Sequence, residues 1–118
     1  MTPEPSWLKP MLDKRDARAI CILSELLEAG LRTGQCSAND ITVRLRTDEH
    51  NVVGGVFKKL RGCGFVQSDR RIAPAKEKSH GRRVYVWELH NHTRARQILQ
   101  RMAGVLVEVR DPAQGELF

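Results

Sequence analysis

The period of the apolar residues changes at residues 62–64, a segment that contains two glycines. Before it, over residues 50–62, apolar side chains recur at the spacing of one helix face: Val53, Val56, Phe57 and Leu60. After it, Phe65 and Val66 open a predicted strand that continues through Ile72, and the run 84–89 is rich in β-branched and aromatic residues, which is typical of strands. The change predicts a helix followed directly by a β-hairpin, with Trp87 in the core.

The residues before this segment predict two more helices. Apolar residues at helical spacing indicate a helix over 13–29, and Gly30 is expected to end it. Ser37 and Asp40 have the spacing of a capping pair, in which each side chain accepts a hydrogen bond from an unpaired backbone N–H. This pair predicts a short helix over 38–46.

The two ends of the chain are expected to lie outside the folded domain. Prolines punctuate residues 1–13, which predicts an extended N-terminal arm. A last helix is predicted over 93–104, so the folded domain covers 14–104. Residues 105–118 are then a C-terminal tail.

Positive charge is concentrated in the middle of the sequence. The chain has 118 residues, which suits a single hydrophobic core, and a formal net charge of +6. Residues 44–83 hold eleven Lys or Arg against four Asp or Glu, whereas the remainder holds nine against ten. A concentrated basic segment favours nucleic acid as a partner, because a merely solvated basic surface would spread its charge.

The sequence offers little support for catalysis, a metal or a membrane. Cys21, Cys36 and Cys63 are scattered and form no CxxC pair, which argues against a disulfide framework or a zinc site. His90 and His92 have no third ligand in evidence. There is no nucleophile motif, paired-carboxylate pattern or Gly-rich phosphate loop, and no apolar run that could span a membrane. We expect a cytoplasmic protein that is not an enzyme and needs no cofactor.

Two sequence stretches carry a resemblance to a known superfamily. These are VVGGVFKKLRGCGFV at 52–66, where Leu60 and Gly64 precede two apolar residues, and SHGRRVYVWEL at 79–89. With the order helix, short helix, helix, strand, basic turn, strand, helix, the chain resembles the winged helix-turn-helix superfamily. MarR-like and phage-type regulators fit equally well. The resemblance implies an α+β fold, with a three-helix core, a two- or three-stranded β-wing and a C-terminal helix.

The same resemblance implies a function, that of a bacterial or phage transcriptional regulator that binds double-stranded DNA. Helix 50–62 would enter the major groove and the basic wing 70–83 would follow the phosphate backbone. The candidate DNA-binding residues are Arg44, Arg46, His50, Asn51, Gly54, Gly55, Lys58, Lys59, Arg70, Arg71, Lys76, Lys78, His80, Arg82 and Arg83.

The outer face of helix 50–62 leaves alternatives open. Asn51 can pair with adenine and Lys58 can reach a guanine or a phosphate, but either side chain can equally be simply solvated. Gly54 and Gly55 each cost about 1 kcal/mol relative to alanine in a helix. They let the helix lie close to DNA or to another subunit, or they mark a helix that frays or bends. We expect few base contacts from this helix and much of the affinity from the wing.

Other partners are conceivable at the C-terminal end. Gln114, Leu117 and Phe118 resemble the Gln-x-x-Leu-Phe peptide by which bacterial proteins dock on the replication sliding clamp, although a disordered end is the alternative. The last helix and the apolar run 105–107 suggest a homodimer surface. A replication-associated winged-helix protein and a winged-helix protein-interaction module are therefore the alternative functions.

Overall fold

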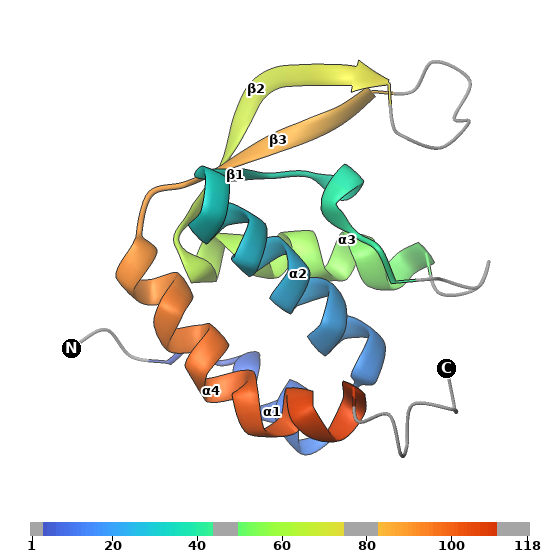
Figure 1. The fold of residues 1–118 in the computed structure, drawn as a ribbon, viewed down its shortest axis with the longest axis vertical. Helices are drawn as coiled ribbons and strands as arrows, with labels where there is room; N and C mark the ends of the chain where they lie inside the picture. The colour runs from blue at the N-terminus through green and yellow to red at the C-terminus, as the bar shows by residue number, and fades with distance from the viewer. Residues whose placement is uncertain (1–3, 44–49, 75–82, 111–118) are drawn as a thin grey trace.

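The computed structural model of the chain describes residues 4–43, 50–74 and 83–110. This part of the chain is an α+β structure of four α-helices and a three-stranded antiparallel sheet (Figure 1). The helices are α1 (Leu8–Asp13), α2 (Ala17–Thr33), α3 (His50–Lys59) and α4 (His92–Arg110). The strands are β1 (Gln35–Cys36), β2 (Phe65–Pro74) and β3 (Arg83–Leu89), with the short 3-10 helices η1 (Ala38–Asp40) and η3 (Leu60–Cys63). The α+β class is as predicted.

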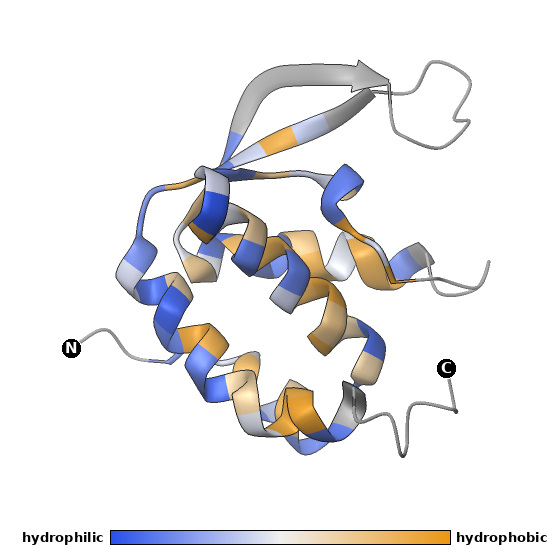
Figure 2. Ribbon diagram, viewed as in Figure 1, coloured by the Kyte–Doolittle hydropathy of each residue, from blue (hydrophilic) through white to orange (hydrophobic). Residues whose placement is uncertain are grey.

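α2 is the central helix of the core. It begins after Asp16, which accepts a hydrogen bond from the Ala19 N–H at 3.3 Å, and it ends at Gly34, where φ is +86°. Its apolar side chains are buried nearly all round the helix: Ile20, Ile22, Leu23, Leu26 and Leu27. Such a helix must be covered on several sides, and α1, α3 and α4 cover it. Figure 2 shows the apolar residues concentrated along these helices.

The prediction that this helix ends at Gly30 is wrong. An added Cβ at Gly30 would lie 2.4 Å from Cζ of Phe65, the first residue of β2. Gly30 is therefore a contact point at which α2 and the start of β2 approach closely, and the helix continues through it. A glycine in the interior of a helix often has a packing reason of this kind, which the neighbouring residues in the sequence do not reveal.

The N-terminal segment differs from the predicted extended arm. Its residues 8–13 form α1, and three apolar side chains of this helix are buried: Leu8, Met11 and Leu12. Pro10 is compatible with the helix because it lies in the first turn, where a backbone N–H has no intrahelical partner. Ion pairs of Glu4 with Arg101 and of Arg15 with Glu108 join this segment to α4 at 2.8 Å and 2.7 Å.

The short helix predicted over 38–46 is only partly present. Ser37 and Asp40 form the predicted capping box, and the Ser37 N–H donates to Oδ2 of Asp40 at 2.8 Å. The helical turn that follows is η1 alone, because Ile41 is extended and the next two backbone N–H groups donate to the Glu25 carboxylate of α2. These donors are satisfied without a helical ladder. The rest of the predicted helix lies outside the described residues.

The sheet has the strand order β1-β3-β2. Phe65 of β2 lies opposite Leu89 of β3, Gln67 lies opposite Trp87, and the pairing is irregular beyond Gln67. Trp87 is buried, as predicted, and its ring stacks on Phe57 of α3 with the centroids 5.8 Å apart. β2 and β3 extend away from the helices as a two-stranded ribbon, which we call the hairpin arm (Figure 1).

α4 extends beyond the predicted helix 93–104 at its C-terminal end. Asn91 caps it by accepting a hydrogen bond from the Arg94 N–H at 2.9 Å. Val105 and Leu106, which the sequence assigns to the tail, lie in this helix and pack against the core. None of the described helices is long and apolar enough to cross a membrane.

Candidate nucleic-acid interface

α3 has one packed face and one open face. Val56 and Leu60, the latter in η3, are buried, and Phe57 packs on Trp87. The opposite side, continued into η3, is an exposed stripe, which we call the α3 outer face: Asn51, Gly54, Lys58 and Arg61. The predicted amphipathic arrangement of this helix is confirmed.

Gly54 and Gly55 are not required by the packing of the described chain. An added Cβ at either position would meet no described atom within 4 Å. Neither residue has a positive φ. Alanine at each position would therefore favour the helix by about 1 kcal/mol, and nothing in the described part of the molecule offsets this preference.

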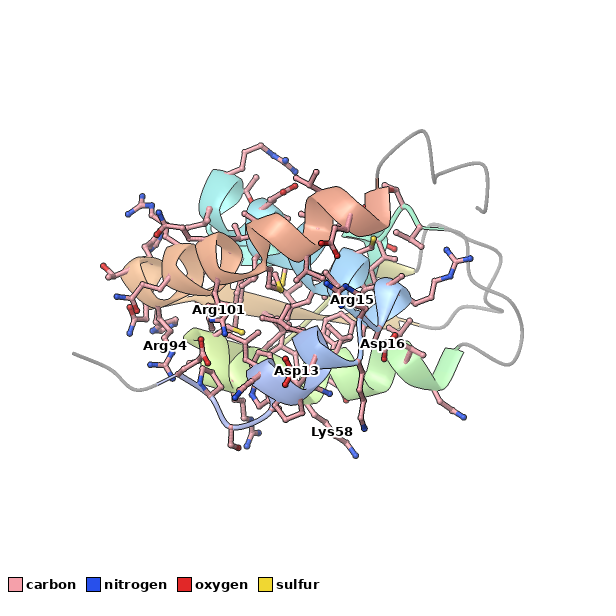
Figure 3. All side chains as sticks on the ribbon, turned by 90° about the horizontal axis from the view of Figure 1, so that it is seen from below. Asp13, Arg15, Asp16, Lys58, Arg94 and Arg101 are labelled. Carbon is pink, nitrogen blue, oxygen red and sulfur yellow. The ribbon has the colours of Figure 1, made fainter. Side chains whose placement is uncertain are left out.

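The α3 outer face itself carries positive charge and no acidic residue. Lys58 and Arg61 are exposed, Lys59 is half-buried, and the sequence has no Asp or Glu from 50 to 67. Lys58 extends from the side of the molecule that lies opposite α4 (Figure 3). Anionic ligands are therefore attracted to this side of α3.

The packing at the C-terminal end of α3 fixes its position against the hairpin arm. Gly64 has a φ of +90°, which only glycine adopts easily, and it turns the chain directly into β2. Nε of Arg94 in α4 donates to the Gly62 carbonyl oxygen at 3.0 Å. Trp7 lies on the same glycine, since an added Cβ there would be 3.0 Å from its Nε1. No sequence signal indicated the Arg94 contact.

The structure brings only part of the predicted site together. Asn51, Gly54, Gly55, Lys58 and Lys59 lie on α3, and Arg61, which was left off the candidate set, belongs with them because it continues the same stripe. The sequence alone could have indicated Arg61, since positions 54, 58 and 61 have the spacing of one helix face.

The other predicted DNA-binding residues are described by backbone alone or not at all. His50 begins α3, Arg70 and Arg71 lie in β2, and Arg83 begins β3. The remaining ones lie outside the described residues: Arg44, Arg46, Lys76, Lys78, His80 and Arg82. In Figure 1 the far end of the hairpin arm and the N-terminal end of α3 lie on the same side of the molecule.

The cysteines are buried free thiols. Burial raises the pKa of Cys36 and of Cys63 to about 12, and Cys63 Sγ also lies 3.6 Å from the Lys59 carbonyl oxygen. Protonated, buried thiols are poor nucleophiles and poor metal ligands. No group of three or more His, Cys, Asp or Glu in the described ranges could hold a metal ion.

Two protein interfaces were predicted, a homodimer surface and a clamp-docking tail, and the structure describes residues of the first one only. The predicted homodimer surface requires Val105 and Leu106 to be surplus to the core, but both pack against the core, and Val107 is 68% exposed. The dimer stays a prediction with a weaker physical basis. Gln114, Leu117 and Phe118 lie outside the described residues, so clamp docking also stays a prediction.

Comparisons of the chain with protein-family models, with curated proteins and with solved structures found no match. The geometry of α3 and the hairpin arm is therefore the basis for any functional conclusion.

Proposed function

We propose that this chain is a winged helix-turn-helix protein that binds double-stranded DNA, with the α3 outer face in the major groove and the hairpin arm along the phosphate backbone. The element order supports this architecture, since α2, β1, α3, β2 and β3 follow one another as in a winged helix. The strand order β1-β3-β2 also supports it, because it places a two-stranded arm directly after the groove-binding helix.

The observation that carries the proposal is the open, acid-free face of a helix whose other face is fixed in the core. A helix with its side chains is about 10–12 Å wide and B-DNA has a major groove about 12 Å wide. Asn51 and Lys58 on this face have the hydrogen-bonding groups that contact bases and phosphates. Val56 and Leu60, on the opposite face, are buried and fix the helix against the core.

The hairpin arm, which follows this helix in the chain, contributes further basic residues. Its strands contain Arg70, Arg71 and Arg83 in a stretch of chain that is strongly basic overall. Arginine side chains that contact DNA phosphates neutralise them, which releases counterions. Affinity for duplex DNA should therefore fall steeply as salt concentration rises.

The test is binding of the full chain to a fluorescent duplex, measured by anisotropy over a range of salt concentrations. We expect the logarithm of the association constant to fall linearly with the logarithm of the salt concentration. Replacing Lys58 and Arg61 by Gln should weaken binding and make that slope shallower by about 1.8, at about 0.9 for each lost phosphate contact.

The matched control removes two positive charges from other helices, by Arg32→Gln in α2 and Arg96→Gln in α4, both exposed. This variant should retain the native slope to within experimental error. Equal losses in the two double variants would contradict the proposed interface. Absence of duplex affinity at moderate salt would contradict DNA binding altogether and favour a protein-interaction module.

A further inference from the structure

The glycines of the described chain fall into two groups. Four are required inside the molecule, by a positive φ or by a side chain that an added Cβ would crowd: Gly30, Gly34, Gly62 and Gly64. Three lie in helices, lack a positive φ and would meet no described atom within 4 Å: Gly54, Gly55 and Gly104. The second group is unexplained by the fold.

Gly54 and Gly55 differ from Gly104 in their surroundings. They are consecutive in α3, where Gly54 lies on the α3 outer face and the half-buried Gly55 borders it. Two consecutive bare positions remove side chains from this face and its edge, so that a partner surface can reach the helix backbone itself. Gly104 is a single position on α4, which lies on the opposite side of the molecule from Lys58 (Figure 3).

The absence of side chains at Gly54 and Gly55 also limits which DNA sequences the helix can distinguish. Base pairs are distinguished in the major groove by hydrogen bonds from side chains, and glycine has no side chain. The backbone N–H and C=O groups at the middle of α3 are already engaged within the helix. Asn51 is then the one amide side chain on the α3 outer face, and the remaining polar members are the cations Lys58 and Arg61, which bind phosphates as well as guanine.

We propose that α3 docks on duplex DNA through its bare backbone at Gly54 and Gly55, so that this site binds duplexes of broad sequence rather than one operator. The inference rests on the proposed function, since it specifies the substrate class of the same face. The docked helix follows the shape of the groove, and the flanking cations hold the phosphates.

The first test compares alanine variants of the two kinds of unexplained glycine. Gly54→Ala with Gly55→Ala adds two methyl groups to the docking face, and Gly104→Ala adds one to α4. Both variants should raise Tm by a few degrees, because each relieves a helical glycine in open space. On a random-sequence duplex, we expect the double variant to bind at least about tenfold more weakly and Gly104→Ala to bind as the native chain does.

The second test is selection of the native chain on random duplexes. A bidentate contact discriminates by about fivefold to 150-fold, so with Asn51 as the one such contact the best selected duplex should bind no more than about 150-fold tighter than the starting pool. A larger ratio would overturn the inference, as would native affinity in the double alanine variant. In either case the native chain still binds duplex DNA, whereas failure of the native chain to bind any duplex would overturn the proposed function instead.

Discussion

The packed contact between α2 and β2 and the outer face of α3 use glycine for opposite reasons. At the first, Gly30 lies against the ring of Phe65, and an added Cβ would overlap that ring at 2.4 Å. At the second, Gly54 and Gly55 have no described atom within 4 Å of an added Cβ. The residue choice in the first region is explained by contacts within the chain. The choice in the second region is unexplained by the described chain, and our proposal attributes it to a partner.

This difference predicts that the two regions respond to mutation in separable ways. Changes in the packed region should alter the free energy of unfolding and leave duplex affinity unchanged while the protein is folded. Changes at Asn51, Lys58 and Arg61 should alter affinity and leave unfolding nearly unchanged, because exposed substitutions are usually within about 0.5 kcal/mol. Alanine at Gly54 and Gly55 should lower affinity although it raises stability. Four measurements test whether the two regions respond separately.

The largest effect is expected at the buried thiols. Burial raises the pKa of Cys36 and Cys63 from 9.0 to about 12, so about a thousandfold less thiolate is present at pH 8 in the folded chain. Reaction with an aromatic disulfide reagent should be correspondingly slower than in urea. Because the folded pKa is raised, stability should also fall as pH rises from 9 toward 12. Rapid labelling of the native chain would show that the packed region is open.

The next effect is Gly30→Ala, which should lower the free energy of unfolding by about 1–3 kcal/mol, because the Phe65 ring must move. Urea denaturation followed by circular dichroism measures it. Gly104→Ala is the control, since it adds the same methyl group in open space and should be stabilising. If both variants were equally stable, the close approach of α2 and β2 would be refuted.

A smaller effect is expected for Asn91→Ala, which removes the acceptor of the Arg94 N–H and should cost about 1 kcal/mol of stability. Asn91→Asp keeps an acceptor and should restore most of the loss. Both variants should bind duplex DNA with native affinity when folded. A loss of affinity in the alanine variant would instead place α4 in the interface with DNA.

The smallest effect is expected at the ion pair between α4 and the turn after α1. The Arg15 guanidinium, through its hydrogen bond and charge, holds the pKa of Glu108 below its ordinary value. This contribution is present above the ordinary carboxylate pKa and is lost as pH falls through the lowered one. Arg15→Gln should return the pKa of Glu108 toward its ordinary value in an NMR titration, with little change in stability because both groups are exposed.

The sequence predicted the elements whose signals are local. The apolar spacing of α3, the glycine at its end and the β-branched run of β3 each depend on neighbouring residues, and each prediction held. The failures involve distant partners. The local sequence predicts a helix end at Gly30 because it contains no sign of the contact with Phe65. It predicts too long a helix over 38–46 because it contains no sign that Glu25 accepts hydrogen bonds from the backbone there.

In the candidate site, too, the local features were predictable and the contacts with distant residues were not. Asn51, Gly54 and Lys58 were identified from helical spacing, which also places Arg61 on the same face. That the two glycines face open space required coordinates, because the sequence alone is equally compatible with a frayed helix or with close packing. The position of α3 against the hairpin arm depends on Arg94 and Trp7, which come from distant parts of the chain.

DNA binding by the α3 outer face is tested by titrating the isotope-labelled chain with duplex DNA and following the backbone amide resonances. We predict that the largest shifts occur from Asn51 to Arg61 and along β2 and β3, while the amides of α1 and the second half of α4 stay in place. Largest shifts in α1 or α4, with the α3 outer face unchanged, would contradict the central claim that this face meets the duplex.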